Sequence, residues 1–257
     1  SEIYGALGYL SEIDFRKKTG QSDHLLTPKV LFRYAPGGMR KETDGTRLSP
    51  SSAFSLDRID NINNFETGLS STFGFDYNFK KNEKEFDFSV AQIINEKENK
   101  DMASKTSLDE KISDLVGKSS YKVNNNMTLN YNFSVDQNYN ELNYSEIGTK
   151  FDFEPLKINF NYLLEDKHIG DQEYFTTKLN LERGSNGIFA FETKRNLITN
   201  SAEFYNLSYN YINDCLKAGI LYRREFYTDR DIEPENSLMF TISIVPIGDI
   251  NSPKFDR

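Results

Sequence analysis

The sequence of 257 residues contains one cysteine, two histidines and no tryptophan. The single cysteine, Cys215, excludes an internal disulfide framework and any cysteine-rich metal site. The two histidines, His24 and His168, lack the HExxH spacing, and the chain has neither a phosphate-binding glycine loop nor a G-x-S-x-G elbow. We therefore expect no enzymatic activity, no catalytic residue, no metal site and no cofactor.

Two polar loops keep weaker alternatives open. Asp166 and His168 lie in one loop and could supply part of an acid–base pair. The triplet DRD at Asp229–Asp231 and the acidic loops could bind divalent cations. Solvated charge is the preferred interpretation of both loops.

Long apolar runs and an excess of basic residues are also lacking. No run approaches the ~20 apolar residues that a membrane-spanning helix needs, and the mean hydropathy is −0.65. The net charge of −8 argues against a nucleic-acid partner. Low hydropathy does not exclude a membrane, because barrel strands alternate apolar with polar residues. No signal peptide precedes Ser1, and we expect the chain to be part of a longer protein.

Alternating residues are the strongest signal that is present. The stretch Ala202–Gly248 predicts three consecutive strands, because side chains on a strand point to opposite faces in turn. One face of these strands is apolar and the other is polar. The apolar positions are Tyr205, Leu207, Tyr209 and Tyr211, then Leu216, Ala218, Ile220 and Tyr222, then Leu238, Phe240, Ile242 and Ile244.

The same rhythm continues through the rest of the chain. About a dozen segments have the ~9–11 residues of a tilted membrane strand, and none has a helical period long enough to trust. Besides the three strands above, the segments are Tyr4–Arg16 (the least clear), Thr27–Ala35, Thr67–Phe79, Phe86–Val90, Asp114–Val123, Met127–Val135, Leu142–Phe153, Leu156–Leu164, Phe175–Glu182 and Gly187–Lys194. The predicted fold is all-β, an antiparallel transmembrane β-barrel.

The lengths of the connections support a barrel over a β-sandwich. Outer-membrane barrels have short periplasmic turns and longer outside loops. When the connections are counted back from the last strand, nearly every long one falls on the outside, including Pro36–Phe65 and Asn95–Ser113. A sandwich has no reason to follow this alternation. A porin or an adhesin remains the alternative, and a soluble glycan-binding sandwich is a more distant one.

Five stretches in this order carry a resemblance to a known family. They are LTPKVLFRYAP, FSLDRIDNINNFETGLSSTFGFDY, FDFSVAQI, SLDEKISDLVGKSSYKVNNNMTLNYNFSVDQ and DCLKAGILYRREFYTDRDIEPENSLMFTISIVPIG. Together they resemble the carboxy-terminal barrel of the LptD family of Gram-negative outer-membrane lipopolysaccharide-assembly proteins. The resemblance implies a very large barrel whose lumen is plugged by an LptE-like lipoprotein. It also implies a periplasmic jellyroll domain, fed by the lipopolysaccharide bridge, and release of lipopolysaccharide between the first and last strands.

The chain departs from that pattern because the jellyroll and half of the barrel are missing from it. Its length suits about 13 strands. We therefore expect residues 1–257 to form a carboxy-terminal portion of the barrel, with no second domain.

The resemblance also assigns roles to individual positions. It implies that Cys215 forms a disulfide with the missing amino-terminal domain, and the loop alternation places Cys215 at the periplasmic end of its strand, in an oxidising compartment. A buried thiol without a role is the alternative. The resemblance makes the strand Ser237–Pro246 one side of the exit gate, with Leu238, Phe240, Ile242, Ile244 and Pro246 as its members. Pro246 removes a backbone donor near the strand end, and a simple strand terminator is the preferred interpretation of that proline.

The expected function is the transport of lipopolysaccharide and its insertion into the outer leaflet by lateral opening of the barrel.

Overall fold

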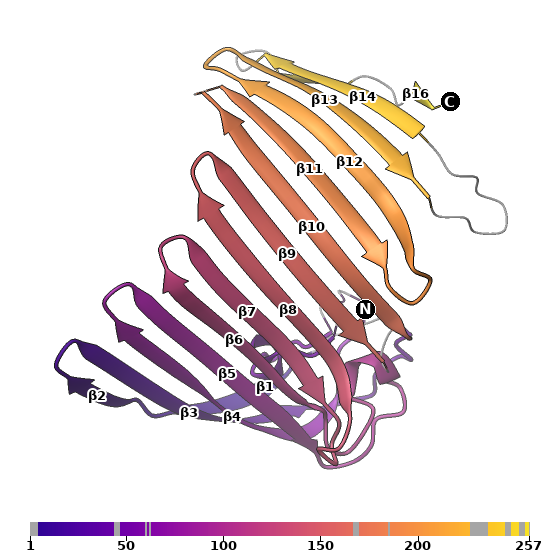
Figure 1. The fold of residues 1–257 in the computed structure, drawn as a ribbon. Helices are drawn as coiled ribbons and strands as arrows, with labels where there is room; N and C mark the ends of the chain where they lie inside the picture. The colour runs from indigo at the N-terminus through magenta and orange to yellow at the C-terminus, as the bar shows by residue number, and fades with distance from the viewer. Residues whose placement is uncertain are drawn as a thin grey trace. The chain divides into compact units, whose positions relative to one another are not determined.

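The structure is a computed structural model that describes residues 5–43, 47–59, 61, 63–166, 170–184, 186–226, 236–244, 248–251 and 255–256. Strands make up most of it (Figure 1). The long strands are β3 (Ser22–Ala35), β4 (Gly68–Lys81), β5 (Lys84–Asn95), β6 (Leu115–Asn124), β7 (Met127–Val135), β8 (Leu142–Phe153), β9 (Leu156–Glu165), β10 (Gln172–Arg183), β11 (Gly187–Asn196), β12 (Ser201–Ile212), β13 (Leu216–Glu225) and β14 (Asn236–Ile244). The short strands are β1 (Leu7–Glu12), β2 (Phe15–Thr19), β15 (Gly248–Asn251) and β16 (Phe255–Asp256).

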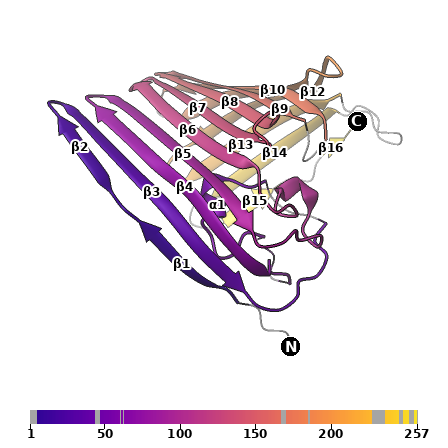
Figure 2. The same ribbon diagram turned by 90° about the horizontal axis from the view of Figure 1, so that it is seen from below.

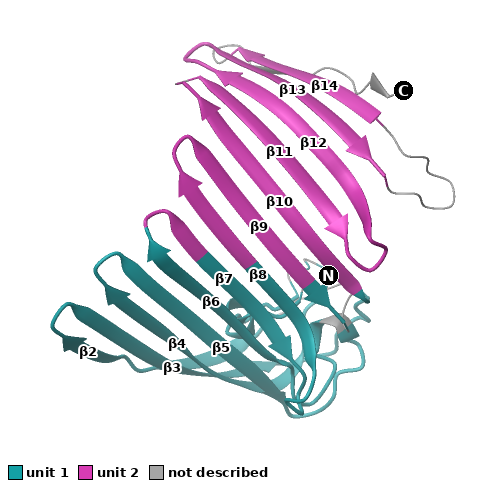
Figure 3. Cartoon of the chain, viewed as in Figure 1, with its two compact units in different colours: residues 1–124, 129–147, 164–171 teal, residues 125–128, 148–163, 172–257 magenta. Residues whose placement is uncertain are grey.

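Residue contacts divide the chain into two compact units, coloured separately in Figure 3. Unit 1 comprises residues 1–124, 129–147 and 164–171, and unit 2 comprises residues 125–128, 148–163 and 172–257. In unit 1 the strand order is β1-β3-β4-β5-β6-β7-β8, with β2 also paired to β3. In unit 2 it is β8-β9-β10-β11-β12-β13-β14-β15, with β16 also paired to β14. Consecutive long strands are therefore neighbours, and the registers are antiparallel.

The registers confirm the predicted two-faced strands. In unit 1, Phe75 lies opposite Val90 and Tyr77 lies opposite Phe88. In unit 2, Tyr222 of β13 lies between Leu207 of β12 and Leu238 of β14. We call the side of each unit that carries these residues the apolar face and the opposite side the polar face.

The first predicted segment is a broken strand rather than a continuous one. Both β1 and β2 pair with β3, and the break between them lies beside Pro28. The Ile13 N–H donates to the carbonyl of Pro28 at 3.3 Å. The carbonyl of Pro28 therefore faces the break, and a backbone N–H at position 28 would face the same way. Because proline has no N–H, the ladder is interrupted there.

Unit 1 contains a hydrophobic core that the alternation did not predict. Its residues come from the polar face of β5 and β6 and from the two long connections that follow β3 and β5. They are Leu48, Ala53, Ile59, Ala91, Ile93, Met102, Leu108 and Val116. The two connections, expected as outside loops, thus fold back over the polar face of unit 1.

Two short helical turns help these connections to fold. The helix α1 (Pro50–Ala53) begins with Ser49, whose side chain accepts from the Ser52 N–H in a capping box. Figure 2 shows α1 beside the strands of unit 1, where it contacts β5 and β6. The second turn, η1 (Ser104–Thr106), has three residues. Neither turn is long enough to produce a helical period in the sequence. Of the helices that the structure describes, none has the length and apolar character needed to span a membrane.

Candidate functional site

The predicted gate strand is β14, and its apolar residues share one face as expected. Leu238, Phe240 and Ile242 are exposed, and Ile244 is partly buried. They lie opposite Tyr222, Ile220, Ala218 and Leu216 of β13. Pro246 lies outside the described residues.

The second edge of β14 is covered in two short pieces. β15 pairs with Thr241–Ile244, and β16 pairs with Ser237 and Leu238. The β14 ladder toward β13 is therefore one continuous register, whereas the described pairing on its other side is with two separate short strands.

Cys215 lies in the turn between β12 and β13. It is exposed and is a free cysteine in this chain. Its N–H and that of Leu216 both donate to the Asn213 side-chain oxygen, at 3.0 and 2.7 Å. Asn213 therefore shapes the turn, and the thiol remains accessible to a partner outside it. The predicted alternative of a buried thiol is wrong, because the turn leaves Cys215 exposed.

The polar face of unit 2 carries paired charges. Lys178 and Glu192 lie on opposite positions of β10 and β11, 2.8 Å apart. Lys157 pairs with Glu182 at 2.6 Å. These side chains are partly or largely exposed, so each pair adds little to the stability of the sheet. They make this face strongly hydrophilic with little net charge.

A buried charge cluster anchors the first long connection of unit 1 to the sheet. Arg58 of the connection is fully buried, and its guanidinium lies 3.0 Å from Glu66 and donates to Thr72 at 3.1 Å. Arg33 of β3 donates to the carbonyls of Leu56 and Glu66, at 2.8 and 2.6 Å. Burial, opposed by the charge of Glu66, lowers the pKa of Arg58. The Glu66 carboxylate also lies 3.8 Å from the Arg33 guanidinium. One carboxylate thus serves two buried guanidiniums, and removing its charge would leave both without this ion pair.

A second anchor lies at the ends of β8 and β9. Arg47 forms an ion pair with the buried Glu165, and its guanidinium lies 3.6 Å from the centroid of the Tyr144 ring. Nearby, the Asp114 carboxylate accepts from Ser134 at 2.7 Å and from Asn143 at 2.8 Å. The two contacts of Arg47 fix the segment 47–51 over the polar face of unit 1.

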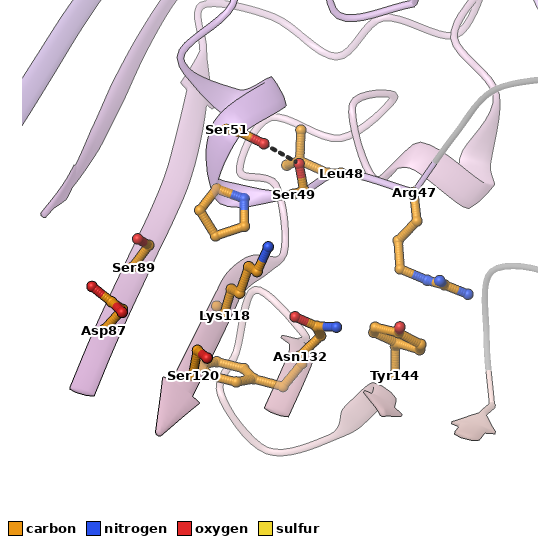
Figure 4. A pocket seen from close by; sticks show the side chains of 13 residues that line it. Arg47, Leu48, Ser49, Ser51, Asp87, Ser89, Lys118, Ser120, Asn132 and Tyr144 are labelled. Carbon is orange, nitrogen blue, oxygen red and sulfur yellow. Dashed lines mark hydrogen bonds between the residues drawn. The ribbon is translucent and has the colours of Figure 1, made fainter. Parts of the chain in front are cut away.

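A pocket of about 520 Å³ lies beneath that segment (Figure 4). Its floor is the polar face of β5, β6 and β7, where Ser89 lies opposite Lys118 and Asp87 lies opposite Ser120. Its roof is the segment 47–51 at the start of α1. The remaining lining residues are Gly117, Asn132, Phe133 and Tyr144.

The weaker predicted candidates are not brought together as an acid–base site. His24 Nδ1 lies 2.8 Å from the Tyr77 hydroxyl, and its ring packs 4.8 Å from that of Phe79, on the apolar face. Asp166 donates its N–H to the carbonyl of Asn143. His168 and Asp229–Asp231 lie outside the described residues. Among the residues the structure does describe, no group of three or more His, Cys, Asp or Glu side chains could hold a metal ion.

The charge clusters and the pocket were not predicted from the sequence. Arg58 and Glu66 lie in or beside a polar loop whose composition is typical of solvated charge. Only their burial in the structure shows that they anchor this connection to the sheet. One signal was available: Arg33 occupies a polar-face position in a strand whose other residues are mostly apolar. Such a charge needs a partner.

Comparison with known proteins gives one family match. The family described as LptD, LPS transport system D, matches residues 6–205. No curated protein matches the chain.

Solved structures with a similar backbone include Rhodopseudomonas blastica porin mutants. A triple mutant is 11% identical with a TM-score of 0.41, and another mutant is 12% identical with a TM-score of 0.42. In both comparisons 98% of this chain and 91% of the porin chain are covered. The family assignment rests on the family match and not on these porins.

Proposed function

The chain belongs to the LptD family of Gram-negative outer-membrane proteins, part of the lipopolysaccharide transport machinery, and on this premise we propose that it inserts lipopolysaccharide into the outer leaflet through a seam beside β14. In this proposal the protein moves its substrate without changing it chemically. The observation that carries the proposal is the two-faced sheet, which matches the two chemical parts of that substrate.

The two faces suit an amphipathic passenger. Exposed aromatic and aliphatic residues such as Leu207, Tyr222 and Phe240 cover the apolar face of unit 2, where acyl chains would be accommodated. The opposite face offers charged pairs such as Lys178–Glu192, which suit a hydrated saccharide. A lipid that crosses with its acyl chains in the membrane and its sugars in the lumen needs both surfaces.

The pairing of β14 supports a seam at this strand. A backbone group without a partner in hydrocarbon is unfavourable by several kcal/mol, so strands facing lipid are normally paired along their whole length. Among the described residues, the edge of β14 away from β13 pairs with two short strands, β15 and β16, rather than with one long strand. Two short strands can separate from β14 one at a time, whereas the β13–β14 ladder is continuous over its described length.

A pulse-labelling experiment tests the seam. A photo-cross-linking amino acid replaces Phe240 of β14 in one variant and Phe191 of β11 in the control, both on the apolar face. Newly synthesised, labelled lipopolysaccharide should cross-link early at position 240 and then chase away. At position 191 the cross-linking signal should rise only as labelled lipopolysaccharide accumulates in the bulk of the outer leaflet. Identical time courses at the two positions would contradict export beside β14.

We also propose that Cys215 forms a disulfide with an amino-terminal domain of the whole protein. Its exposed position in a turn supports this, because a partner domain can reach the thiol. The mature protein should migrate differently on gels with and without reductant, and Cys215→Ser should abolish the difference. A wild-type protein that reacts fully with a thiol reagent without reduction would overturn this pairing.

The remaining proposed partners are an LptE-like lipoprotein in the lumen and the periplasmic lipopolysaccharide bridge, reached through the amino-terminal domain. Purification of the whole protein in detergent should recover a lipoprotein in equal amounts. Recovery of the protein alone, with small-solute conductance typical of an open channel, would favour a porin instead.

A further inference from the structure

We propose that the pocket beneath the segment 47–51 binds the saccharide part of lipopolysaccharide through its hydroxyl groups and one acidic group. This inference rests on the proposed function, because it takes the exported lipid as the source of the sugar. It adds a specific binding site on the polar face of unit 1.

The chemistry of the lining suits a polyol. Hydroxyls of Ser49, Ser51, Ser89 and Ser120, the amide of Asn132 and the carboxylate of Asp87 surround the space. Sugar hydroxyls donate and accept hydrogen bonds, so a mixed set of hydroxyl, amide and carboxylate groups can satisfy several of them at once. The volume of about 520 Å³ lies within the range of about 300–1,000 Å³ that small-ligand pockets have.

Three floor residues are available for a ligand. Lys118, Ser89 and Ser120 have no side-chain hydrogen bond or ion pair with any part of the chain that the structure describes, although each lies among polar neighbours. Figure 4 shows Lys118 pointing toward the roof segment. An exposed ammonium that faces a pocket and lacks a carboxylate partner favours an acidic group on the ligand.

The roof is preorganised without using these residues. Leu48 is buried in the core of unit 1, Arg47 is paired with Glu165, and the capping box of α1 holds Ser49. The Ser49 and Ser51 hydroxyls lie 3.0 Å apart. Because the pocket is held open by contacts on its far side, binding would require little ordering of the chain.

A titration of the detergent-purified whole protein tests the site. The probe is the lipid-free, acidic core oligosaccharide released from lipopolysaccharide by mild acid, and the comparison probe is neutral maltotriose. The oligosaccharide should bind saturably, and maltotriose should bind at least tenfold more weakly because it lacks an acidic group. Equal binding of the two probes would overturn the acidic specificity, and no saturable binding of the oligosaccharide would overturn the site.

Matched variants locate the binding in this pocket. Lys118→Gln should weaken oligosaccharide binding about tenfold or more, because one charge-assisted hydrogen bond is lost. Lys122→Gln should leave it unchanged, because Lys122 stands on the same face of β6 but does not line the pocket. Ser120→Phe, which fills the space, should abolish binding. Equal effects of the Lys118 and Lys122 variants would reject the assignment.

The site and the export route fail separately. If position 240 gives no transit signal, the proposed export beside β14 is rejected, while the titration still decides whether the pocket binds the acidic saccharide. If the titration fails and position 240 shows transit, the export proposal stands without this site.

Discussion

The polar faces of the two units are built in opposite ways. In unit 1, two long connections fold over the sheet and create a core that contains Ile93 and Leu108. Within the described residues of unit 2, no large hydrophobic side chain is buried, and the polar face carries partly exposed ion pairs such as Lys178–Glu192. The same strand pattern thus supports a covered surface in one unit and a hydrated surface in the other, depending on the connections.

The largest effect should follow from breaking the buried charge cluster of unit 1. Glu66→Gln leaves Arg33 and Arg58 buried without their anion, and we expect a loss of about 3–5 kcal/mol in the stability of the covering segment. Limited trypsin digestion should then cleave the first long connection rapidly. Glu192→Gln in unit 2, which breaks a partly exposed pair, should change the digestion little. Equal sensitivity of the two variants would contradict the distinction between the units.

A cavity in the core of unit 1 should have the next largest effect. Ile93 is fully buried, and Ile93→Ala should lower the free energy of unfolding by about 2–5 kcal/mol. Leu221 on the polar face of unit 2 is only partly buried, and Leu221→Ala should lower it by about 1 kcal/mol or less. Urea titration in lipid vesicles, followed by tyrosine fluorescence, measures both. If the two losses are the same, the core of unit 1 does not stabilise the protein as described.

A pair of glycines sharpens the comparison at the backbone. A Cβ at Gly74 would lie 2.1 Å from the Val90 carbonyl oxygen and 3.1 Å from the Phe54 ring, so Gly74→Ala should be unfavourable by about 1–3 kcal/mol. A Cβ at Gly219 would meet the ends of the Asn210 and Thr241 side chains, at 2.6 and 2.7 Å. Those side chains can move, so Gly219→Ala should be unfavourable by less than about 1 kcal/mol. The same urea titration compares them, and a larger loss at Gly219 would refute the close packing of unit 1.

The smallest effect should be seen with salt. Raising the ionic strength from 0.1 M to about 1 M shortens the screening length from ~10 Å to ~3 Å and should remove what little Lys178–Glu192 contributes, less than about 1 kcal/mol. The Arg58–Glu66 pair is buried and should respond much less. A double-mutant cycle on each pair at both salt concentrations measures the coupling. Coupling of Arg58 to Glu66 that falls as steeply as that of the exposed pair would show that water reaches the cluster.

The strands were predicted well because their signal is local. Met127–Val135 and Leu142–Phe153 form β7 and β8 with the predicted bounds. In a two-faced strand, the polarity of each residue indicates which face its side chain is on. The registers then confirmed that Leu207, Tyr222 and Leu238 share a face. The segment Tyr4–Arg16 was the least clear in the sequence. Its ladder is interrupted by Pro28, which lies in the neighbouring strand β3 and not in the segment itself.

The covering segments were not predicted because their signal is not local. Leu48 and Ile59 stand among Gly, Pro, Ser and charged residues that are typical of a solvated loop. Their burial depends on contact with Ile93 and Val116, which are distant in the sequence. The pocket likewise needs side chains from the first connection and from β5, β6 and β7.

The sequence alone determined the all-β class, the bounds of most strands and the division into an apolar and a polar face, because alternation with period two records which way each side chain points. Only the tertiary structure decided which part of the polar face is covered, where Arg33, Arg58 and Glu66 meet, and that a pocket remains beneath the segment 47–51. Those features depend on how a long connection folds back on a sheet, and contacts between residues far apart in the chain leave no periodic trace in it.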